Sequence, residues 1–286
     1  MTFAAVNLPR IFFVFGKGGV GRSTVAAALA MMCADRGERV LVLEWAIADP
    51  IGPWFGAAAA GPAPLSVAPG IAVANFTLDD ALRAYFVDHL HLGILYRSVI
   101  RARAVARMLE IAPGLAEMFF LGELWWLTTL AEHERGLHFD RIIVDAPATG
   151  HGASLLDVPD TLAKMPLAGL LALETTRVTS LMADPERAGA VLVSLAEPLV
   201  VDETLELVPR LPREPLALIV NRSVDQLGEL PAHGPLAALA DELRMRRSVE
   251  RELRAHFTCP ALAVPELPGE RPLEVVRAAA RALEAG

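Results

Sequence analysis

Residues 11–30 read IFFVFGKGGVGRSTVAAALA, and this stretch decides the fold of the chain. Its first five residues are all apolar, which predicts a short buried strand. Glycine then occupies four of the next six positions, and glycine allows the backbone to turn tightly. Ser23 and Thr24 follow, and the alanine-rich run after them favours a helix. The stretch is therefore predicted to fold as a strand, a glycine-rich turn and a helix that begins with a hydroxyl pair.

This order of elements is that of a phosphate-binding P-loop. The backbone N–H groups of such a turn point inward at an anion, and the positive end of the helix dipole faces the same way. A Ser or Thr hydroxyl at the helix start completes a Mg²⁺ shell. The alternative is a glycine-rich turn without a ligand, which the strand and helix on either side disfavour. The predicted nucleotide-binding residues of the loop are Gly16, Lys17, Gly18, Gly19, Val20, Gly21, Arg22, Ser23 and Thr24.

Two positions of the loop depart from the usual pattern GxxxxGK[ST]. Lys17 directly follows the first glycine, which marks the deviant subclass GKGGxGK[ST]. Arg22 stands where the phosphate-binding lysine is expected. Both are cations, but the longer, planar guanidinium must fit a loop shaped for a compact ammonium. Nucleotide binding is therefore predicted more firmly than hydrolysis.

The composition of the whole chain narrows its class. With 286 residues and 53% hydrophobic residues, it is long and apolar enough to bury a large core, as one large α/β domain or two small ones. A net charge of −8 disfavours non-specific binding to nucleic acid. The two cysteines, Cys33 and Cys259, form no CxxC pair, so we expect a reducing cytoplasm and no cysteine metal site. No apolar run approaches the ~20 residues of a membrane span, and no signal peptide is expected.

Strands and helices are expected to alternate along the rest of the chain. After residues 11–15, apolar runs predict strands at 40–43, 71–75, 141–145, 190–195, 216–220 and 261–264, with helical segments between most of them. The Ala-, Gly- and Pro-rich residues 57–70 are expected to form a surface excursion. Such alternation predicts a mostly parallel sheet covered by helices on both faces. No linker or repeat divides the chain, so residues 1–286 are expected to form one domain.

Several segments together carry a resemblance to a known family. GKGGVGRST (16–24) resembles its P-loop, and APGLAEM (112–118) its PGxxE segment. VDAPATGHGASLL (144–156) resembles its switch II motif, and residues 184–207, which begin DPER, a further family segment. The chain thus resembles the ArsA-like ATPases, which include the arsenite-pump ATPase and the tail-anchored-protein targeting factor. The resemblance implies a single P-loop NTPase domain with a short helical insertion after switch II, and ATP and Mg²⁺ as cofactors.

The resemblance also implies roles for individual residues. Ser23 would bind Mg²⁺, and Asp145 would hold the water shell of the ion. The backbone of Gly150 would sense the γ-phosphate, so that hydrolysis is coupled to movement. Asn221 would read the adenine base, and Pro265 lies in the segment VPELPGE, which would close over the base.

The partners implied by the resemblance follow from Lys17. This lysine would reach across an interface to the phosphates of a partner subunit. The expected assembly is therefore a homodimer, or a heterodimer with an ArsA-like paralogue, that acts on a protein client the sequence does not name. Arsenite pumping and tail-anchor delivery by the known routes are disfavoured, because the helical insertion is short and the chain lacks a CxxC zinc pair and an arsenite-binding cysteine trio.

Switch I departs from the family pattern DTDPAHS, whose second Asp orients the attacking water. Alignment of VLVLEW places Glu44 at the first Asp and Ala46 at the second. Asp49 also precedes a proline, and it substitutes as the catalytic acid only if the loop is re-routed. We therefore expect an ATPase with slow or partner-dependent hydrolysis.

Two other functions remain open at this stage. One is a catalytically degenerate subunit that binds nucleotide and pairs with a competent paralogue, because binding and water activation use separate residues. The other is a client-binding chaperone that uses the helix bearing Trp125 and Trp126. For these two tryptophans, packing in the core is the favoured interpretation.

Overall fold

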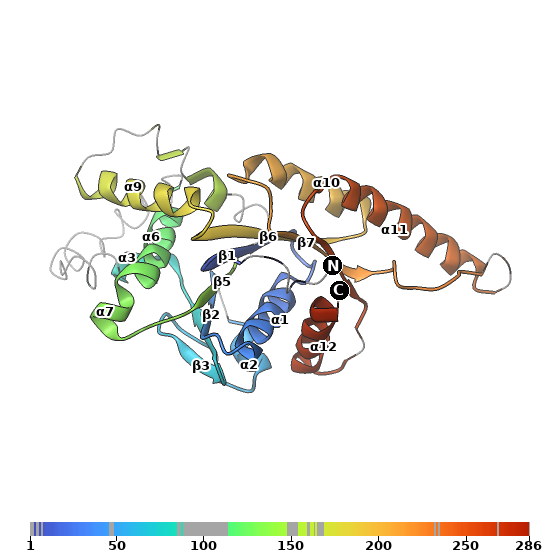
Figure 1. Ribbon diagram of the computed structural model, residues 1–286, viewed down its shortest axis with the longest axis horizontal. Helices are drawn as coiled ribbons and strands as arrows, with labels where there is room; N and C mark the ends of the chain where they lie inside the picture. Colours follow the sequence, from blue (N-terminus) through green and yellow to red (C-terminus); the bar gives the residue numbers. More distant parts are fainter. Residues whose placement is uncertain are drawn as a thin grey trace.

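The structure is a computed structural model, and it describes most of the chain (Figure 1). The described residues are 3, 6, 8–45, 49–84, 87, 114–147, 154–158, 161–162, 164, 169–231, 233, 235–267 and 269–285.

An eight-stranded sheet forms the centre of the fold, with the strand order β3-β4-β2-β5-β1-β6-β7-β8. Its strands are β1 (Ile11–Phe15), β2 (Val40–Glu44), β3 (Leu65–Ala68), β4 (Ile71–Asn75), β5 (Arg141–Asp145), β6 (Ala188–Leu195), β7 (Ala217–Ser223) and β8 (Ala261–Pro265). Every neighbouring pair is parallel except β3 and β4. The mostly parallel sheet predicted from the alternation of strands and helices is confirmed.

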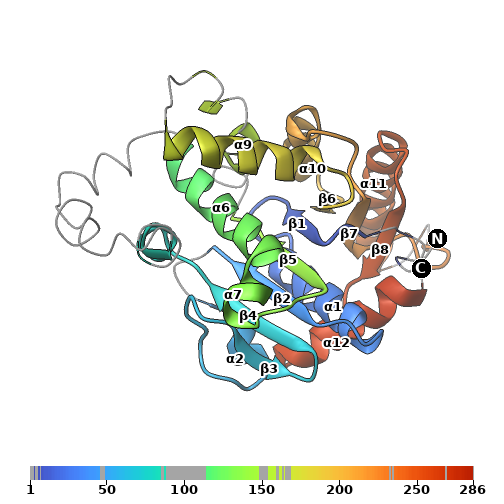
Figure 2. The ribbon, with the colours of Figure 1, turned by 60° about the vertical axis from the view of Figure 1, so that its left-hand side comes forward.

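Helices cover both faces of this sheet, as Figures 1 and 2 show. The described helices are α1 (Arg22–Asp35), α2 (Ile51–Trp54), α3 (Leu78–Arg83), α6 (Leu115–Thr129), α7 (Ala131–Arg135), α9 (Leu170–Ala183), α10 (Pro198–Leu207), a 3₁₀ turn at Val208–Arg210, α11 (Ala237–Ala255) and α12 (Pro272–Ala285). One apolar cluster joins α1 and α12 to one face, and a second joins α6, α9 and α11 to the other. Burial of apolar side chains on both faces is the main stabilising term of such a layered fold.

The surface excursion predicted at residues 57–70 contains a strand that the sequence pattern did not indicate. Leu65–Ala68 pairs antiparallel with β4 at the edge of the sheet, and its side chains are only half-buried or exposed. An edge strand has one partner and one covered side, so its sequence needs no continuous apolar run. For this reason, the Ala-, Gly- and Pro-rich composition of residues 57–70 did not indicate strand β3.

The topology places the candidate site beyond the carboxyl ends of the parallel strands. Parallel strands end on the same side, so the residues that follow β1, β2, β5 and β7 meet there. The chain leaves β1 toward β2 on one side, and β6 pairs with β1 on the other. Ligands of open α/β sheets bind at such a change of direction, just beyond the carboxyl ends of the strands. The glycine-rich loop lies at this point, between β1 and α1.

Candidate nucleotide-binding site

Two glycines shape the loop between β1 and α1. A Cβ atom on Gly16 would lie 2.4 Å from the carbonyl oxygen of Val193, so no side chain fits at this position. Gly21 has φ +90°, and a Cβ atom there would lie 2.3 Å from Nδ2 of Asn221. A positive φ and a close approach both require glycine. Only glycine at these two positions permits the observed backbone of residues 16–24, which we call the cradle.

The first backbone N–H groups of α1 have no side-chain cap. Gly21 is the N-cap residue, with no side-chain capping hydrogen bond and no acidic residue in the first turn of the helix. The first N–H groups of a helix need an outside acceptor, and the helix dipole favours an anion there. This end of α1 fits the phosphates of a nucleotide.

Arg22 lies against the cradle rather than pointing away from it. Its Nη1 donates a hydrogen bond of 3.0 Å to the carbonyl oxygen of Gly16. Burial lowers the pKa of Arg22, and the charge of Asp145 acts in the opposite direction. The guanidinium thus closes the loop on itself and adds a cation beside the phosphate cradle.

The other residues of the loop form the rest of the turn between β1 and α1. Gly19 also has a positive φ, of +87°, with open space around it, and Val20 is buried. Gly18 lies in the turn, and Thr24 lies in the first turn of α1, half-buried. The predicted loop residues are therefore assembled in one continuous cradle.

Ser23 and Asp145 meet across the site although they are 122 residues apart in the sequence. The hydroxyl of Ser23 donates a hydrogen bond of 2.5 Å to Oδ2 of Asp145. Oδ1 of Asp145 is buried and has no hydrogen-bond partner among the described residues. Burial raises the pKa of this carboxyl, while the bond from Ser23 and the charge of Arg22 lower it. A hydroxyl beside a carboxylate with a spare oxygen fits Mg²⁺, which prefers oxygen ligands.

A metal ion here would depend on water and phosphate for the rest of its shell. Among the described residues, no cluster of three His, Cys, Asp or Glu side chains is placed to hold a metal. Mg²⁺ commonly keeps several waters and binds through one or two protein groups plus the phosphates of a substrate. Ser23 and Asp145 would hold the ion, and the ion would neutralise phosphate charge.

Lys17 forms an ion pair within its own chain. Its Nζ lies 2.7 Å from Oε1 of Glu203 on α10, and the two side chains are 27% and 31% exposed. The ammonium is therefore held by an acid at the rim of the site, partly in contact with solvent. A lysine that reaches a partner subunit has to leave this carboxylate first.

Asn221 and Pro265 lie near the carboxyl ends of the neighbouring strands β7 and β8. Nδ2 of Asn221 donates a hydrogen bond of 2.8 Å to the carbonyl oxygen of Val20 in the loop. Arg222, the next residue, has a positive φ of 49° and donates its N–H to Oδ1 of Asn221. The expected base-reading residue is thus in contact with the phosphate cradle. Pro265 ends β8 and pairs with Ser223 of β7.

Asp49 is bound by the backbone of its own loop. The N–H groups of Gly52 and Ala60 donate to its two carboxyl oxygens at 2.9 Å and 2.6 Å. Although burial acts to raise it, hydrogen bonds from Glu44 and from these backbone groups hold the pKa of Asp49 below its usual value. Each oxygen of Asp49 therefore already stabilises the loop after β2.

Glu44 is the last residue of β2 and is 1% exposed. Burial raises its pKa to about 10, and the hydrogen bond to Asp49 and the charges of Asp49 and Asp145 act in the same direction. Glu44 is the only acid in the otherwise apolar strand β2, and a buried acid in such a strand is a sequence signal for a functional position. No comparable pattern marks Glu203, because its contact with Lys17 depends on the packing of α10.

Two predicted positions lie outside the described residues. They are Ala46, aligned with the water-orienting Asp of switch I, and Gly150, the expected γ-phosphate sensor.

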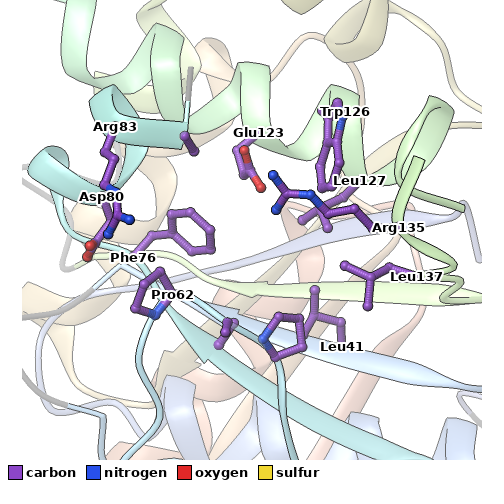
Figure 3. A pocket seen from close by; sticks show the side chains of 14 residues that line it. Leu41, Pro62, Phe76, Asp80, Arg83, Glu123, Trp126, Leu127, Arg135 and Leu137 are labelled. Carbon is purple, nitrogen blue, oxygen red and sulfur yellow. The ribbon is translucent and has the colours of Figure 1, made fainter. Parts of the chain in front are cut away.

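A separate cavity of about 480 Å³ lies between the sheet and helices α3, α6 and α7 (Figure 3). Phe76 projects into it, and Arg83 and Arg135 lie on opposite walls. Trp126 lines the same cavity and is 2% exposed, so core packing is confirmed for this tryptophan. The guanidinium of Arg177 lies 4.1 Å from the ring centre of the half-buried Trp125. The paired tryptophans therefore contribute mainly to the packing around α6.

Comparison with known proteins agrees with this geometry. Residues 9–169, which include the cradle, Asp49 and Asp145, match the family model described as anion-transporting ATPase. The chain belongs to this family. The ArsA-like resemblance seen in its motifs is thereby confirmed.

Two similar proteins are 33% and 29% identical to this chain over the regions that align with it. ATPase BagA of Mycobacterium tuberculosis (strain ATCC 25618 / H37Rv) is 33% identical over 234 residues, which are 78% of this chain and 66% of that protein. The arsenical pump-driving ATPase of Acidiphilium multivorum is 29% identical over 206 residues, or 66% of this chain and 34% of that protein. The matched region thus spans just under two thirds of the first relative and about one third of the second. Within the described part of the chain, none of the helices combines the length and apolar character that a membrane crossing requires.

Proposed function

We propose that this chain binds ATP with Mg²⁺, hydrolyses it slowly, and uses the nucleotide state to control its conformation. The observation that carries the proposal is the cradle, whose Ser23–Asp145 pair stands beside backbone that only glycine permits. The cradle binds the phosphates through backbone N–H groups and the end of α1. Ser23 holds Mg²⁺, and Asp145 holds water around the ion. Asn221 and Pro265 flank the adenine.

Slow hydrolysis follows from the carboxylates near the γ-phosphate position. The residue aligned with the water-orienting Asp is Ala46, which carries no carboxylate. Asp49 is the substitute that the sequence offers, but both of its oxygens accept hydrogen bonds from backbone N–H groups. A general base or water-positioning group contributes about 10²–10⁴-fold to a rate. Its absence slows turnover while leaving nucleotide affinity nearly unchanged.

The proposed assembly is a dimer that closes around nucleotide. Lys17 is partly exposed at the rim of the cradle, where a second subunit can approach it. In a nucleotide-bound dimer, this lysine exchanges Glu203 for the phosphates of the partner. The second subunit is either another copy or an ArsA-like paralogue, and the dimer acts on a protein client.

A second candidate function is a non-catalytic subunit that pairs with a competent paralogue. The same two observations, Ala46 and the engaged oxygens of Asp49, favour it. The two functions differ in one measurable property. A slow ATPase hydrolyses bound ATP by itself, whereas the non-catalytic subunit does so only when the paralogue is present.

Single-turnover hydrolysis of ATP by the purified chain tests the proposal. We expect tight binding and very slow turnover, a faster rate in Ala46→Asp and little change in Asp49→Asn. Lys17→Ala is the variant that separates dimer-dependent from intrinsic turnover. A brisk wild-type rate that Asp49→Asn abolishes would identify Asp49 as the catalytic acid and refute the argument from Ala46. Failure of the wild-type chain to bind ATP would refute the proposed function itself.

A further inference from the structure

The cavity between the sheet and helices α3, α6 and α7 is separate from the nucleotide site. Leu41 of β2 and Ala74 of β4 form part of its floor, and both belong to the apolar cluster on the α6 face of the sheet. Helix α1, which begins in the cradle, packs on the opposite face. No residue of the cradle lines the cavity. A molecule bound in the cavity would therefore leave the phosphate site open.

The cavity is apolar in its depth and basic at its mouth. Phe76, Trp126 and Leu127 line the depth and are buried, with 2–5% of each residue exposed. Arg83 and Arg135 also line the cavity, but both are exposed, and they lie on opposite walls (Figure 3). The volume of about 480 Å³ falls within the range of about 300–1,000 Å³ that is typical of small-molecule sites. This arrangement fits a molecule whose apolar part enters first.

Two acids line the same cavity, and each faces a partner in the structure. Oδ2 of Asp80 accepts hydrogen bonds from the N–H and the hydroxyl of Thr77, so this carboxylate caps the start of α3. Glu123 is 6% exposed, and its carboxylate points toward the guanidinium of Arg135 (Figure 3). A guanidinium has five N–H donors, so Arg135 can face Glu123 and still donate to a ligand. The acids therefore do not prevent the mouth from binding an anion.

Arg135 is positioned by a tryptophan that lines the cavity. The guanidinium of Arg135 lies 4.8 Å from the ring centre of Trp126, which is a cation–π contact. The ring itself is held by its Nε1, which donates a hydrogen bond of 2.8 Å to Oε2 of Glu134. The planar fork of a guanidinium matches a carboxylate and binds it through two parallel hydrogen bonds. Arg135 is thus a preorganised carboxylate-binding group beside an apolar cavity.

We propose that this cavity binds a small carboxylic acid with an apolar chain or ring. The apolar part of the ligand lies against Phe76 and Trp126, and its carboxylate is bound by Arg135 at the mouth. An uncharged molecule of the same shape would leave the guanidinium without this contact, and an amine would meet two cations. The inference goes beyond the proposed function, because it requires neither nucleotide nor a second subunit.

Octanoate is the probe that tests the class of ligand, with octanol and octylamine as molecules of the same chain length. Isothermal titration calorimetry of the full chain without nucleotide should show one saturable site for octanoate. Hydrogen bonds to a charged group change affinity by about 10–100-fold, so octanol should bind more weakly by about this factor and octylamine more weakly still. Arg135→Met should weaken octanoate by a similar factor and leave octanol unchanged. Arg177→Met is the matched control, because it removes a guanidinium from the ring of Trp125, which does not line the cavity.

A second pair of variants tests the place of binding. Ala72 and Ala74 lie on β4 and face the same apolar cluster, but only Ala74 lines the cavity. Ala74→Leu fills part of the space and should abolish saturable binding of octanoate, whereas Ala72→Leu should preserve it.

The proposal is overturned if the wild-type chain shows no saturable site for octanoate, or if octanol or octylamine binds as tightly. Unchanged octanoate affinity in Arg135→Met, or in a folded Ala74→Leu, would overturn it as well. Should Ala74→Leu fail to fold, Arg135→Met decides the question, because Arg135 is exposed. None of these measurements involves ATP, so their failure would leave the proposed function unaffected.

Discussion

Replacement of Gly21 by valine is the perturbation whose effect the structure defines most directly. Gly21 has φ +90°, and a Cβ atom there would lie 2.3 Å from Nδ2 of Asn221. The strained backbone of a β-branched residue costs about 1–3 kcal/mol. Displacement of Asn221 breaks its 2.8 Å hydrogen bond to Val20, which is worth about 0.5–1.5 kcal/mol. The total is about 1.5–4.5 kcal/mol.

The loop escapes this strain by leaving the binding conformation, so the cost appears as lost nucleotide affinity. At about 1.4 kcal/mol per factor of ten, affinity for ATP should fall by about 10- to 1,000-fold. Isothermal titration calorimetry with ATP and Mg²⁺ measures this loss. Gly37→Val is the control, because Gly37 has a similar φ of +85° at the far end of α1 with no atom within 4 Å.

Both variants should lose thermal stability, and only Gly21→Val should lose ATP affinity. If Gly21→Val binds ATP as tightly as Gly37→Val does, the close approach at Gly21 does not shape the phosphate site, and the assignment of the loop is wrong.

Three further predictions concern charged groups. Arg22→Lys restores the usual loop cation and should leave ATP affinity and turnover equal or higher in a binding and turnover assay; a large loss would show that the loop is built around the guanidinium. Glu203→Gln removes the partner of Lys17 and should promote ATP-dependent dimerisation in sedimentation velocity, and an unaltered dissociation constant would exclude competition between the two contacts. His138 has a raised pKa because Glu132 and then Asp140 hydrogen-bond its ring, so the stability it contributes is present below about pH 6.5 and is lost as pH rises through the raised value. Thermal melts of His138→Asn should therefore show a larger deficit at pH 6 than at pH 9, and equal deficits would contradict this.

Local sequence was sufficient for the elements that build the cradle. The apolar run of β1, the glycines and the alanine-rich start of α1 act over a few residues, so their structure follows from backbone sterics and helix propensity. The same holds for β2 and β5, whose continuous apolar runs are typical of strands buried on both faces. The family motifs then indicated the partners Ser23 and Asp145.

Tertiary structure alone decided which distant side chains meet. The contact of Lys17 with Glu203 depends on how α10 packs beside the loop, and the contact of Asn221 with Val20 joins residues 201 positions apart. Glu44 stands out in the sequence as an acid in an apolar strand, but only the register shows that it lies beside Asp145. Strand order and register are set by packing over the whole sheet. The residue pattern within one strand therefore does not predict which strand lies beside it. For this reason the cradle could be predicted from the sequence, whereas the contacts that surround it could not.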